Sequence, residues 1–312
     1  MKKHLAILVA ATASLALTAC GSGNPLASSA PASSAPASSA ASGGSTVSVV
    51  VGSANFPENE LLADIYAGAL TAKGVQVSTK LNIASRETYV PALKNGEIDL
   101  IPEYTGGFSK YLDANADISD EAKALASLKS LLPDNLVALD PSKAQDNDSI
   151  TVTRATADKY SLKTIEDLQP VAGELVLGGP PEWKNRALGV PGLKKVYNLT
   201  FKDFKALDVA GPLTVQALKN GQVQAANLFT TDPAIKANDF VTLEDTKSFF
   251  GAQNVVPVIN KDKATPEVTA ALNAVSAKLD TDTLATLVTK VVVDKEDAAT
   301  VASDWLKSVS LA

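Results

Sequence analysis

The chain has 312 residues, of which 46% are hydrophobic and 20% charged, with a formal net charge of −6. This acidic balance argues against nucleic acid as a partner, because phosphate backbones bind basic surfaces. The only histidine is His4 and the only cysteine is Cys20. Beyond Cys20 the sequence therefore excludes Ser-His-Asp and Cys-His catalysis, His-based zinc sites and disulfides. No G-x-S-x-G, P-loop or G-x-G-x-x-G motif supports an enzyme that uses carboxylates alone, so we expect no catalytic residues, no metal and no cofactor.

The N-terminus has the pattern of an exported protein. Residues 1–19 contain Lys2 and Lys3, then a short apolar run, and end in small residues of the kind found at cleavage sites. This pattern predicts a secretory signal peptide. The run Leu17-Thr18-Ala19-Cys20 resembles the lipobox of bacterial lipoproteins, which implies that Cys20 is lipidated. We therefore expect a protein anchored to the outer face of the cell membrane through lipid only. Residues 20–45 are rich in Ser, Ala and Pro and predict a flexible tether.

The folded part begins with a β-branched run at Val47–Val51, which is typical of a buried parallel strand. Phe56-Pro57-Glu58 then opens a helix predicted to end near Ala72, and 75–83 reads as the next strand. The following helix contains Pro91, which is tolerated only in a first turn, so this helix is predicted to start near Thr88.

An internal repeat organises the rest of the chain. Residues 90–105 recur 125 positions later at 215–230, with seven of sixteen positions identical. Each copy predicts a helix closed by a left-handed glycine, Gly96 or Gly221, and then a strand that ends in an aromatic residue and a threonine. Because ligands bind at the carboxyl ends of strands in open α/β sheets, we expect two lobes with Tyr104 and Phe229 facing each other across a cleft. The alternative is two ordinary helix-strand units that resemble each other by chance.

The remaining elements predict where the chain passes between these lobes. A helix at 121–132 and a strand at 136–139 lead to a polar stretch, 143–149, which is the first candidate crossing before a strand at 150–153. The loop 178–183 is rigid and rich in Gly and Pro, and a helix carrying Arg186 is predicted to follow. After a strand at 240–243, residues 254–259 are the candidate return, and 266–305 is predicted to be helical and to pack on the first lobe. The predicted lobes are 46–148 plus 257–312 and 149–256, joined by two connections that form a hinge.

Four segments carry a family resemblance: 52–56, 100–106, 179–186 and 229–232, which read GSANF, LIPEYTG, GPPEWKNR and FTTD. They resemble the substrate-binding lipoproteins of osmoprotectant ABC importers, the ProX-like binders of glycine betaine, carnitine and choline. The resemblance covers residues 47–310 and implies a type II periplasmic-binding-protein fold with two Rossmann-like lobes and a two-segment hinge. It also implies a box of aromatic rings for a quaternary ammonium, which cannot donate hydrogen bonds and is held by ring faces instead.

The sequence departs from that family at several positions of the box. Tyr104 matches one cage tyrosine and Phe229 occupies the position of another. Asp148-Ser149 and Gln253 stand where relatives carry tyrosines, while Ala54 and Gly107 replace a lysine and a threonine. A cleft with two rings and Asp148, Glu87, Gln253 and Arg186 nearby could hold a larger or hydroxylated cation, or a neutral polar solute.

The expected ligand contacts, and the alternatives for them, come from these motifs. The set comprises Asn55, Glu87, Tyr104, Thr105, Arg186, Phe229, Thr230 and Gln253. Arg186 could instead cap its loop through Glu182, Asn55 could form a turn, and Glu87 could be a first-turn acid. Trp183 is expected to pack or form a lid, and Tyr66, Tyr89, Tyr111, Tyr160 and Tyr197 to be core or surface residues.

The predicted function is that of an extracytoplasmic receptor that captures a quaternary-ammonium or related polar osmolyte by hinge closure and delivers it to an ABC permease and its ATPase subunits. The receptor is expected to be a monomer. One alternative is a surface lipoprotein of the same fold used for sensing or adhesion. A hydrolase, suggested only by the cleft and its carboxylates, is the other.

Overall fold

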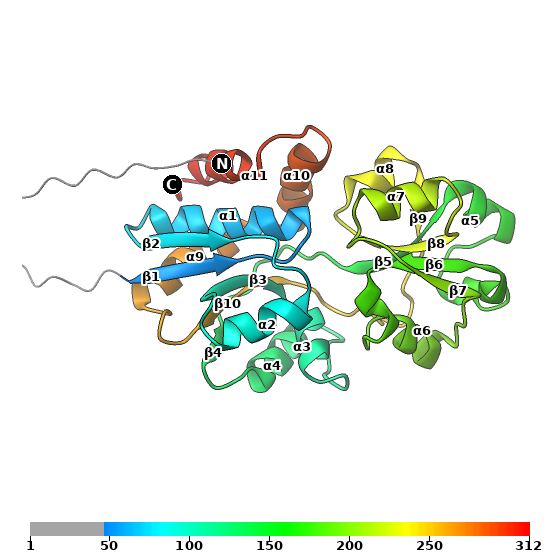
Figure 1. Cartoon of the computed structure of the whole chain (residues 1–312), viewed down its shortest axis with the longest axis horizontal. Helices are drawn as coiled ribbons and strands as arrows, with labels where there is room; N and C mark the ends of the chain where they lie inside the picture. The colour runs from blue at the N-terminus through cyan, green and yellow to red at the C-terminus, as the bar shows by residue number, and fades with distance from the viewer. Residues whose placement is uncertain (1–46) are drawn as a thin grey trace, which may run out of the picture. The chain divides into compact units, whose positions relative to one another are not determined.

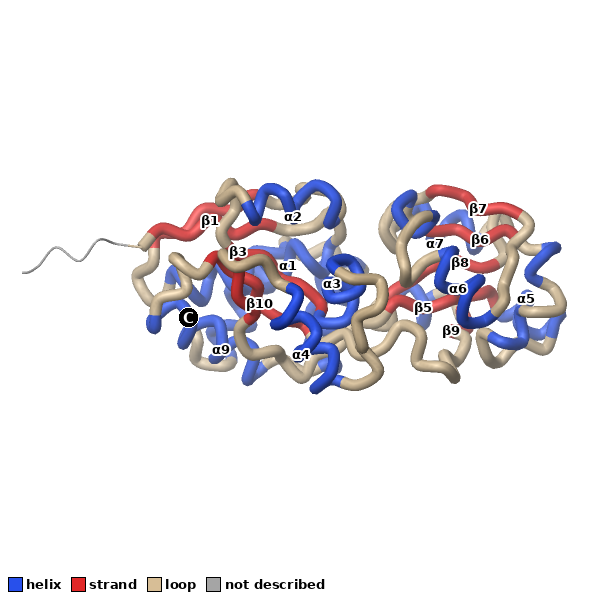
Figure 2. The backbone as a smooth tube through the Cα atoms, turned by 90° about the horizontal axis from the view of Figure 1, so that it is seen from below, coloured by secondary structure: helices blue, strands red, loops and turns tan. Residues whose placement is uncertain are grey.

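The structure is a computed structural model and describes residues 47–312. The predicted signal peptide, Cys20 and the tether lie outside the described residues. The described residues form one compact unit that contains two mixed five-stranded sheets, whose strands appear as separate groups in Figures 1 and 2. Within the described part of the chain, no helix is both long and apolar enough to cross a bilayer.

The strands alternate with helices along most of the chain. The strands are β1 (Ser48–Gly52), β2 (Gln76–Lys80), β3 (Leu100–Tyr104), β4 (Leu136–Ala138), β5 (Asp148–Thr153), β6 (Val176–Gly179), β7 (Asp203–Ala206), β8 (Ala225–Phe229), β9 (Phe240–Thr242) and β10 (Val255–Asn260). The α-helices are α1 (Pro57–Thr71), α2 (Arg86–Lys94), α3 (Thr105–Leu112), α4 (Glu121–Leu131), α5 (Arg154–Tyr160), α6 (Val190–Tyr197), α7 (Pro212–Lys219), α8 (Pro233–Ala237), α9 (Pro266–Lys278), α10 (Thr281–Val292) and α11 (Ala298–Ser308).

The two sheets have the same topology. The first has the order β2-β1-β3-β10-β4 and the second β7-β6-β8-β5-β9. In each, the fourth strand of that order, β10 or β5, is antiparallel to both neighbours. The two repeat strands, β3 and β8, occupy the same central place, which confirms that the repeat is structural.

Helices cover both faces of the first sheet. Val255 and Ile259 of β10 pack in a core with α1, α9, α10 and α11, whereas Val256 and Val258 pack on the other face with α2, α3 and α4. This alternation follows from the period of two along a strand. We call the first sheet with these helices the first lobe, and the second sheet with α5–α8 the second lobe.

The two segments that cross between the lobes pair with each other. Gln145 and Asn254 form an isolated antiparallel bridge, the Asp146 amide donates to the Gln253 carbonyl at 3.2 Å, and the Val255 amide donates to the Ala144 carbonyl at 2.9 Å. The sheet pairing begins at Asp148 in the second lobe and at Val255 in the first. Both crossings therefore run side by side as a short two-stranded connection.

Most predicted elements are confirmed. The candidate return crossing at 254–259 is instead mostly β10 (Val255–Asn260), a strand of the first sheet, and three other elements differ from the prediction. The helix α2 starts at Arg86 rather than Thr88, so Pro91 lies inside it, beyond the first turn. Arg186 is not in a helix, because it lies in the bend between a 3₁₀ turn (Pro181–Lys184) and α6. The predicted helical stretch 266–305 is three helices, of which the last two begin at N-caps where Asp280 and Asp297 accept bonds from backbone amides.

Candidate ligand-binding site

A cavity of about 670 Å³, counting the solvent at its mouth, lies where the repeat strands end. Its lining residues come from both lobes and from the crossing segments. They are Ala54, Asn55, Phe56, Ser85, Arg86, Tyr89, Tyr104, Gly107, Asp146, Asp148, Pro180, Glu182, Trp183, Arg186, Val209, Asn227, Phe229 and Gln253. The carboxyl ends of the strands are where ligand sites form in open α/β sheets.

Three aromatic rings form one wall of the cavity. Tyr104 ends β3 opposite Val255, and Phe229 ends β8 opposite Asp148. Phe56 lies between them, with ring centroids 6.2 Å from Tyr104 and 5.1 Å from Phe229. In the sequence, Phe56 marks a helix start and belongs to the GSANF segment, and it was not expected to contact a ligand. Its position directly before Pro57, after a strand end, was the available signal for a cavity residue.

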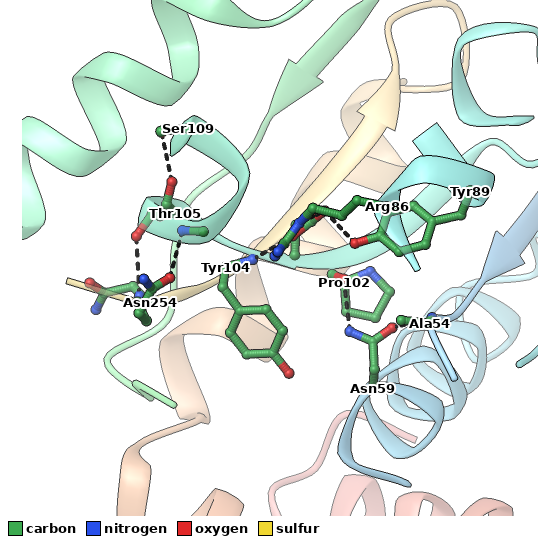
Figure 3. Close-up of polar contacts among 12 residues, drawn as sticks. Ala54, Asn59, Arg86, Tyr89, Pro102, Tyr104, Thr105, Ser109 and Asn254 are labelled. Carbon is green, nitrogen blue, oxygen red and sulfur yellow. Dashed lines mark hydrogen bonds and ion pairs between the residues drawn. The ribbon is translucent and has the colours of Figure 1, made fainter. Parts of the chain in front are cut away.

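A buried ion pair forms a second part of the lining. The Arg86 guanidinium donates to both oxygens of Glu103, the shortest bond being 2.7 Å from Nη2 to Oε2, and the Glu103 side chain is fully buried. The Tyr89 hydroxyl donates to Glu103 at 2.6 Å, and the Tyr104 amide donates at 3.0 Å. Figure 3 shows Arg86 and Tyr89 together on one side of the strand. Neither Arg86 nor Tyr89 was predicted as a site residue. Tyr89 is a buried core residue, as expected, and it also lines the cavity.

Asp148 and Asn227 face the cavity from neighbouring strands of the second sheet. The Asn227 Nδ2 donates to Asp148 Oδ1 at 2.8 Å. Burial raises the pKa of Asp148, although the Asn227 hydrogen bond and the charges of Arg86 and Arg186 act in the opposite direction. With Asp148 and Asn227, this part of the wall is polar rather than aromatic.

An ion pair joins the two lobes at the edge of the cavity. The Arg186 Nε and Nη2 donate to the two oxygens of Glu87, at 3.1 and 2.7 Å. Partial burial would raise the pKa of Glu87, but Arg186 and the Ser85 hydroxyl lower it to about 2. The Arg186 side chain is thus the partner of Glu87 and not of the Glu182 side chain, while the Arg186 backbone amide donates to the Glu182 carbonyl at 3.1 Å.

A second contact between the lobes is made by buried carboxyl groups. The Thr231 hydroxyl, from the second lobe, lies 2.7 Å from Glu58 Oε2 and 2.8 Å from Asp146 Oδ1, and the Tyr104 hydroxyl donates to Glu58 Oε1 at 2.7 Å. One hydroxyl has a single proton, so the second short contact of Thr231 requires a proton on one of the carboxyl groups. Burial is the main reason that the pKa values of both Glu58 and Asp146 are raised.

The other predicted contacts divide into two groups. Asn55 and Gln253 line the cavity, and the Gln253 Oε1 also accepts a bond from the Gly107 amide at 2.7 Å. Thr105 and Thr230 do not line it. Their hydroxyls bond to backbone amides of the crossing segments, of Asn254 and Asn147 respectively, and Figure 3 shows the side chains of Thr105 and Tyr104 leaving the strand in different directions. Because successive side chains of an extended chain point in opposite directions, the threonine that follows Tyr104 or Phe229 points to the crossing segments and not into the cavity.

Comparison with known proteins was consistent with this geometry. Residues 47–308 match the family described as the substrate binding domain of ABC-type glycine betaine transport system. The chain belongs to this family. It is similar to the glycine betaine-binding protein YehZ of Escherichia coli K12, at 28% identity over 273 residues, which cover 83% of this chain and 90% of the relative. It is also similar to the carnitine transport binding protein OpuCC of Listeria monocytogenes 10403S, at 26% identity over 247 residues, which cover 77% of this chain and 80% of the relative.

Solved structures show the same fold for this glycine betaine-type substrate-binding domain. A crystal structure of a glycine betaine/carnitine/choline ABC transporter protein superposes with a TM-score of 0.66 at 24% identity, covering 84% of this chain and 99% of the other. Apo YehZ gives a TM-score of 0.59 at 27% identity, covering 86% and 100%. The chain is therefore a solute-binding component of an ABC transport system with the two-lobed fold of type II periplasmic binding proteins. Its family is a class of solute-binding proteins and not an enzyme class.

Proposed function

We propose that the chain captures a quaternary ammonium or a related small polar osmolyte in the cavity between its lobes and presents it to an ABC permease with its ATPase subunits. The observation that carries this proposal is the wall of three rings, Phe56, Tyr104 and Phe229, at a place where both lobes and both crossings meet. Ring faces replace water around a methylated ammonium, each contributing about 0.5–2 kcal/mol. The lobes close around the solute through the paired crossing segments, and no turnover takes place.

The location follows from the N-terminal pattern. In this proposal residues 1–19 are removed on export, and lipid on Cys20 anchors a monomer to the outer face of the membrane through the 20–45 tether. Relatives that bind glycine betaine and carnitine for transport support the solute class, and nothing in the comparisons favours a sensing or adhesive role.

Calorimetric titration of the full chain in detergent with choline, glycine betaine and carnitine tests the proposal. We expect at least one of these solutes to bind. Its binding should increase the free energy of unfolding by RT ln(1+[L]/Kd) and therefore raise the melting temperature. Phe56→Leu should weaken that binding about threefold to thirtyfold, because one ring face is lost. Tyr160→Leu, which removes a ring outside the cavity, should leave it unchanged. Absence of binding by every member of the panel contradicts the proposal.

A further inference from the structure

The cavity contains a buried hydrogen-bond acceptor that has no donor. Asn227 is completely buried on β8 and lines the cavity, and its Oδ1 has no hydrogen-bond partner within residues 47–312. The orientation of this amide is fixed, because Nδ2 must be the atom that donates to the Asp148 carboxylate. A buried acceptor left without a donor costs about 1–3 kcal/mol. Its position in the cavity wall indicates that a ligand supplies the missing donor.

Two carboxyl groups in the same wall form no ion pair within the described residues, although the charges of Arg86 and Arg186 oppose the rise that burial causes in the pKa of Asp148. Asp148 accepts one bond, from Asn227, and forms no ion pair among the described residues. Glu182 also lines the cavity, and its Oε2 is buried with neither a hydrogen bond nor an ion pair in the described part of the chain. Buried carboxylates are stable when they are paired, so both groups favour a positively charged occupant.

The two cations of the wall are already neutralised. Arg86 donates through Nε and Nη2 to Glu103, and Arg186 donates through the same two nitrogens to Glu87. No lysine is among the lining residues of the described chain. A ligand carboxylate would have to share a guanidinium whose charge is balanced, close to Asp148 and Glu182, and like charges in a partly dry site repel each other.

We propose that the solute of this cavity is a cation that carries at least one O–H or N–H donor and no carboxylate. Its charged centre lies against Phe56, Tyr104 and Phe229, and its donor reaches Asn227 Oδ1 and the Asp148 carboxylate. This inference rests on the proposed function, and it narrows the solute class from osmolytes in general, many of them zwitterions, to donor-bearing cations.

Three ligands of similar size distinguish the effect of the ligand's net charge from the effect of its hydrogen-bond donor. Choline is a cation with a hydroxyl donor, its O-methyl ether is a cation without a donor, and glycine betaine is a zwitterion. Calorimetric titration of the full chain in detergent should show choline binding at least about tenfold more tightly than either of the others, which is the scale of one hydrogen bond to a charged group.

Substitutions in the cavity wall test which residues cause the preference for choline. Asp148→Asn and Asn227→Leu should each reduce the preference of choline over its methyl ether to less than about threefold. Asp134→Asn removes an exposed carboxylate that forms no hydrogen bond in the described chain, and it should leave the preference intact. The melting temperature of each variant is measured first, and Asn227→Ser serves as a smaller change should Asn227→Leu fail to fold.

The outcomes separate this inference from the function on which it rests. Glycine betaine or the methyl ether binding as tightly as choline overturns the inference and leaves the proposed function standing. The inference is also overturned if the preference for choline persists in both Asp148→Asn and the Asn227 variant. Other residues would then accept the hydrogen bond from the choline hydroxyl. Failure of all three probes and of carnitine to bind overturns the proposed function and the inference with it.

Discussion

Glu58 and Asp146 are two carboxyl groups that meet in the interior between the lobes, where Thr231 bridges them. Both are almost fully buried, at 4% exposure each. Burial disfavours their charged forms and raises both pKa values, and the nearby charge of Glu58 raises that of Asp146 further. In the unfolded chain their pKa values return to about 4.

The sign of the pH dependence follows from these raised values. The folded state holds a proton that the unfolded chain has released above about pH 4, so the stabilisation is complete below that pH and is lost as the pH rises through the folded pKa. Burial also raises the pKa of Asp232, to about 6, so Asp232 adds to this loss of stability with rising pH. We expect the melting temperature to fall between about pH 4 and pH 7, by at least ~2 °C, which is about 1 kcal/mol for a chain of this size.

Differential scanning calorimetry across that pH range checks this expectation. Glu58→Gln should make the slope shallower, because the amide does not titrate and still offers an acceptor to Tyr104. Glu97→Gln, at an exposed position, should keep the wild-type slope. A slope unchanged in Glu58→Gln would show that this pair does not carry the pH dependence.

At the scale of elements, the repeat places equivalent helices and strands in the two lobes. The helices α2 and α7 both end in Lys-Asn-Gly, and Gly96 and Gly221 have φ angles of +74° and +70°. A Cβ at either glycine would meet nothing within 4 Å, so backbone conformation alone requires glycine there. The left-handed residue closes the helix and directs the chain into β3 or β8.

Gly221→Ala is therefore expected to reduce the free energy of unfolding by about 1 kcal/mol, the cost of a left-handed residue with a Cβ. Gly221→Asn should cost less, because asparagine tolerates that conformation. Gly173→Ala provides the control, since its Cβ also meets open space and its φ is not positive. Urea denaturation of the three variants measures the change in the free energy of unfolding. Equal decreases for Gly221→Ala and Gly173→Ala would contradict the argument from left-handed backbone strain.

For the whole folded unit, several contacts between the lobes lie around the cavity. The Arg186–Glu87 pair, the Thr231 bridge and the contact of Phe56 with Phe229 all join residues of different lobes. The crossing segments are held together by backbone bonds between residues 144–146 and 253–255. The Arg186–Glu87, Thr231–Glu58 and Phe56–Phe229 contacts must break when the lobes separate, so each contributes to the closed state and hence to apparent ligand affinity.

A double-mutant cycle on Arg186→Gln and Glu87→Gln measures one of these contributions. We expect a coupling of about 0.5–1 kcal/mol in ligand affinity, roughly a twofold to fivefold effect, because the pair is partly exposed, and we expect it to weaken with added salt. The matched control is the exposed pair Arg154–Asp239, at 3.1 Å within the second lobe, whose cycle should not change affinity. Additive effects of the two Arg186 and Glu87 substitutions on affinity would show that the pair does not stabilise closure.

The sequence by itself determined most of the elements and the repeat, because apolar periodicity, glycine and proline act locally and a duplicated segment folds the same way twice. It also placed Tyr104 and Phe229 at strand ends. Only the tertiary structure decided which side chains meet: Phe56 between the two rings, Glu87 with Arg186, and Asn227 with Asp148. These pairs join residues from 48 to 173 positions apart, and their contact depends on strand order and lobe packing, which no local pattern encodes.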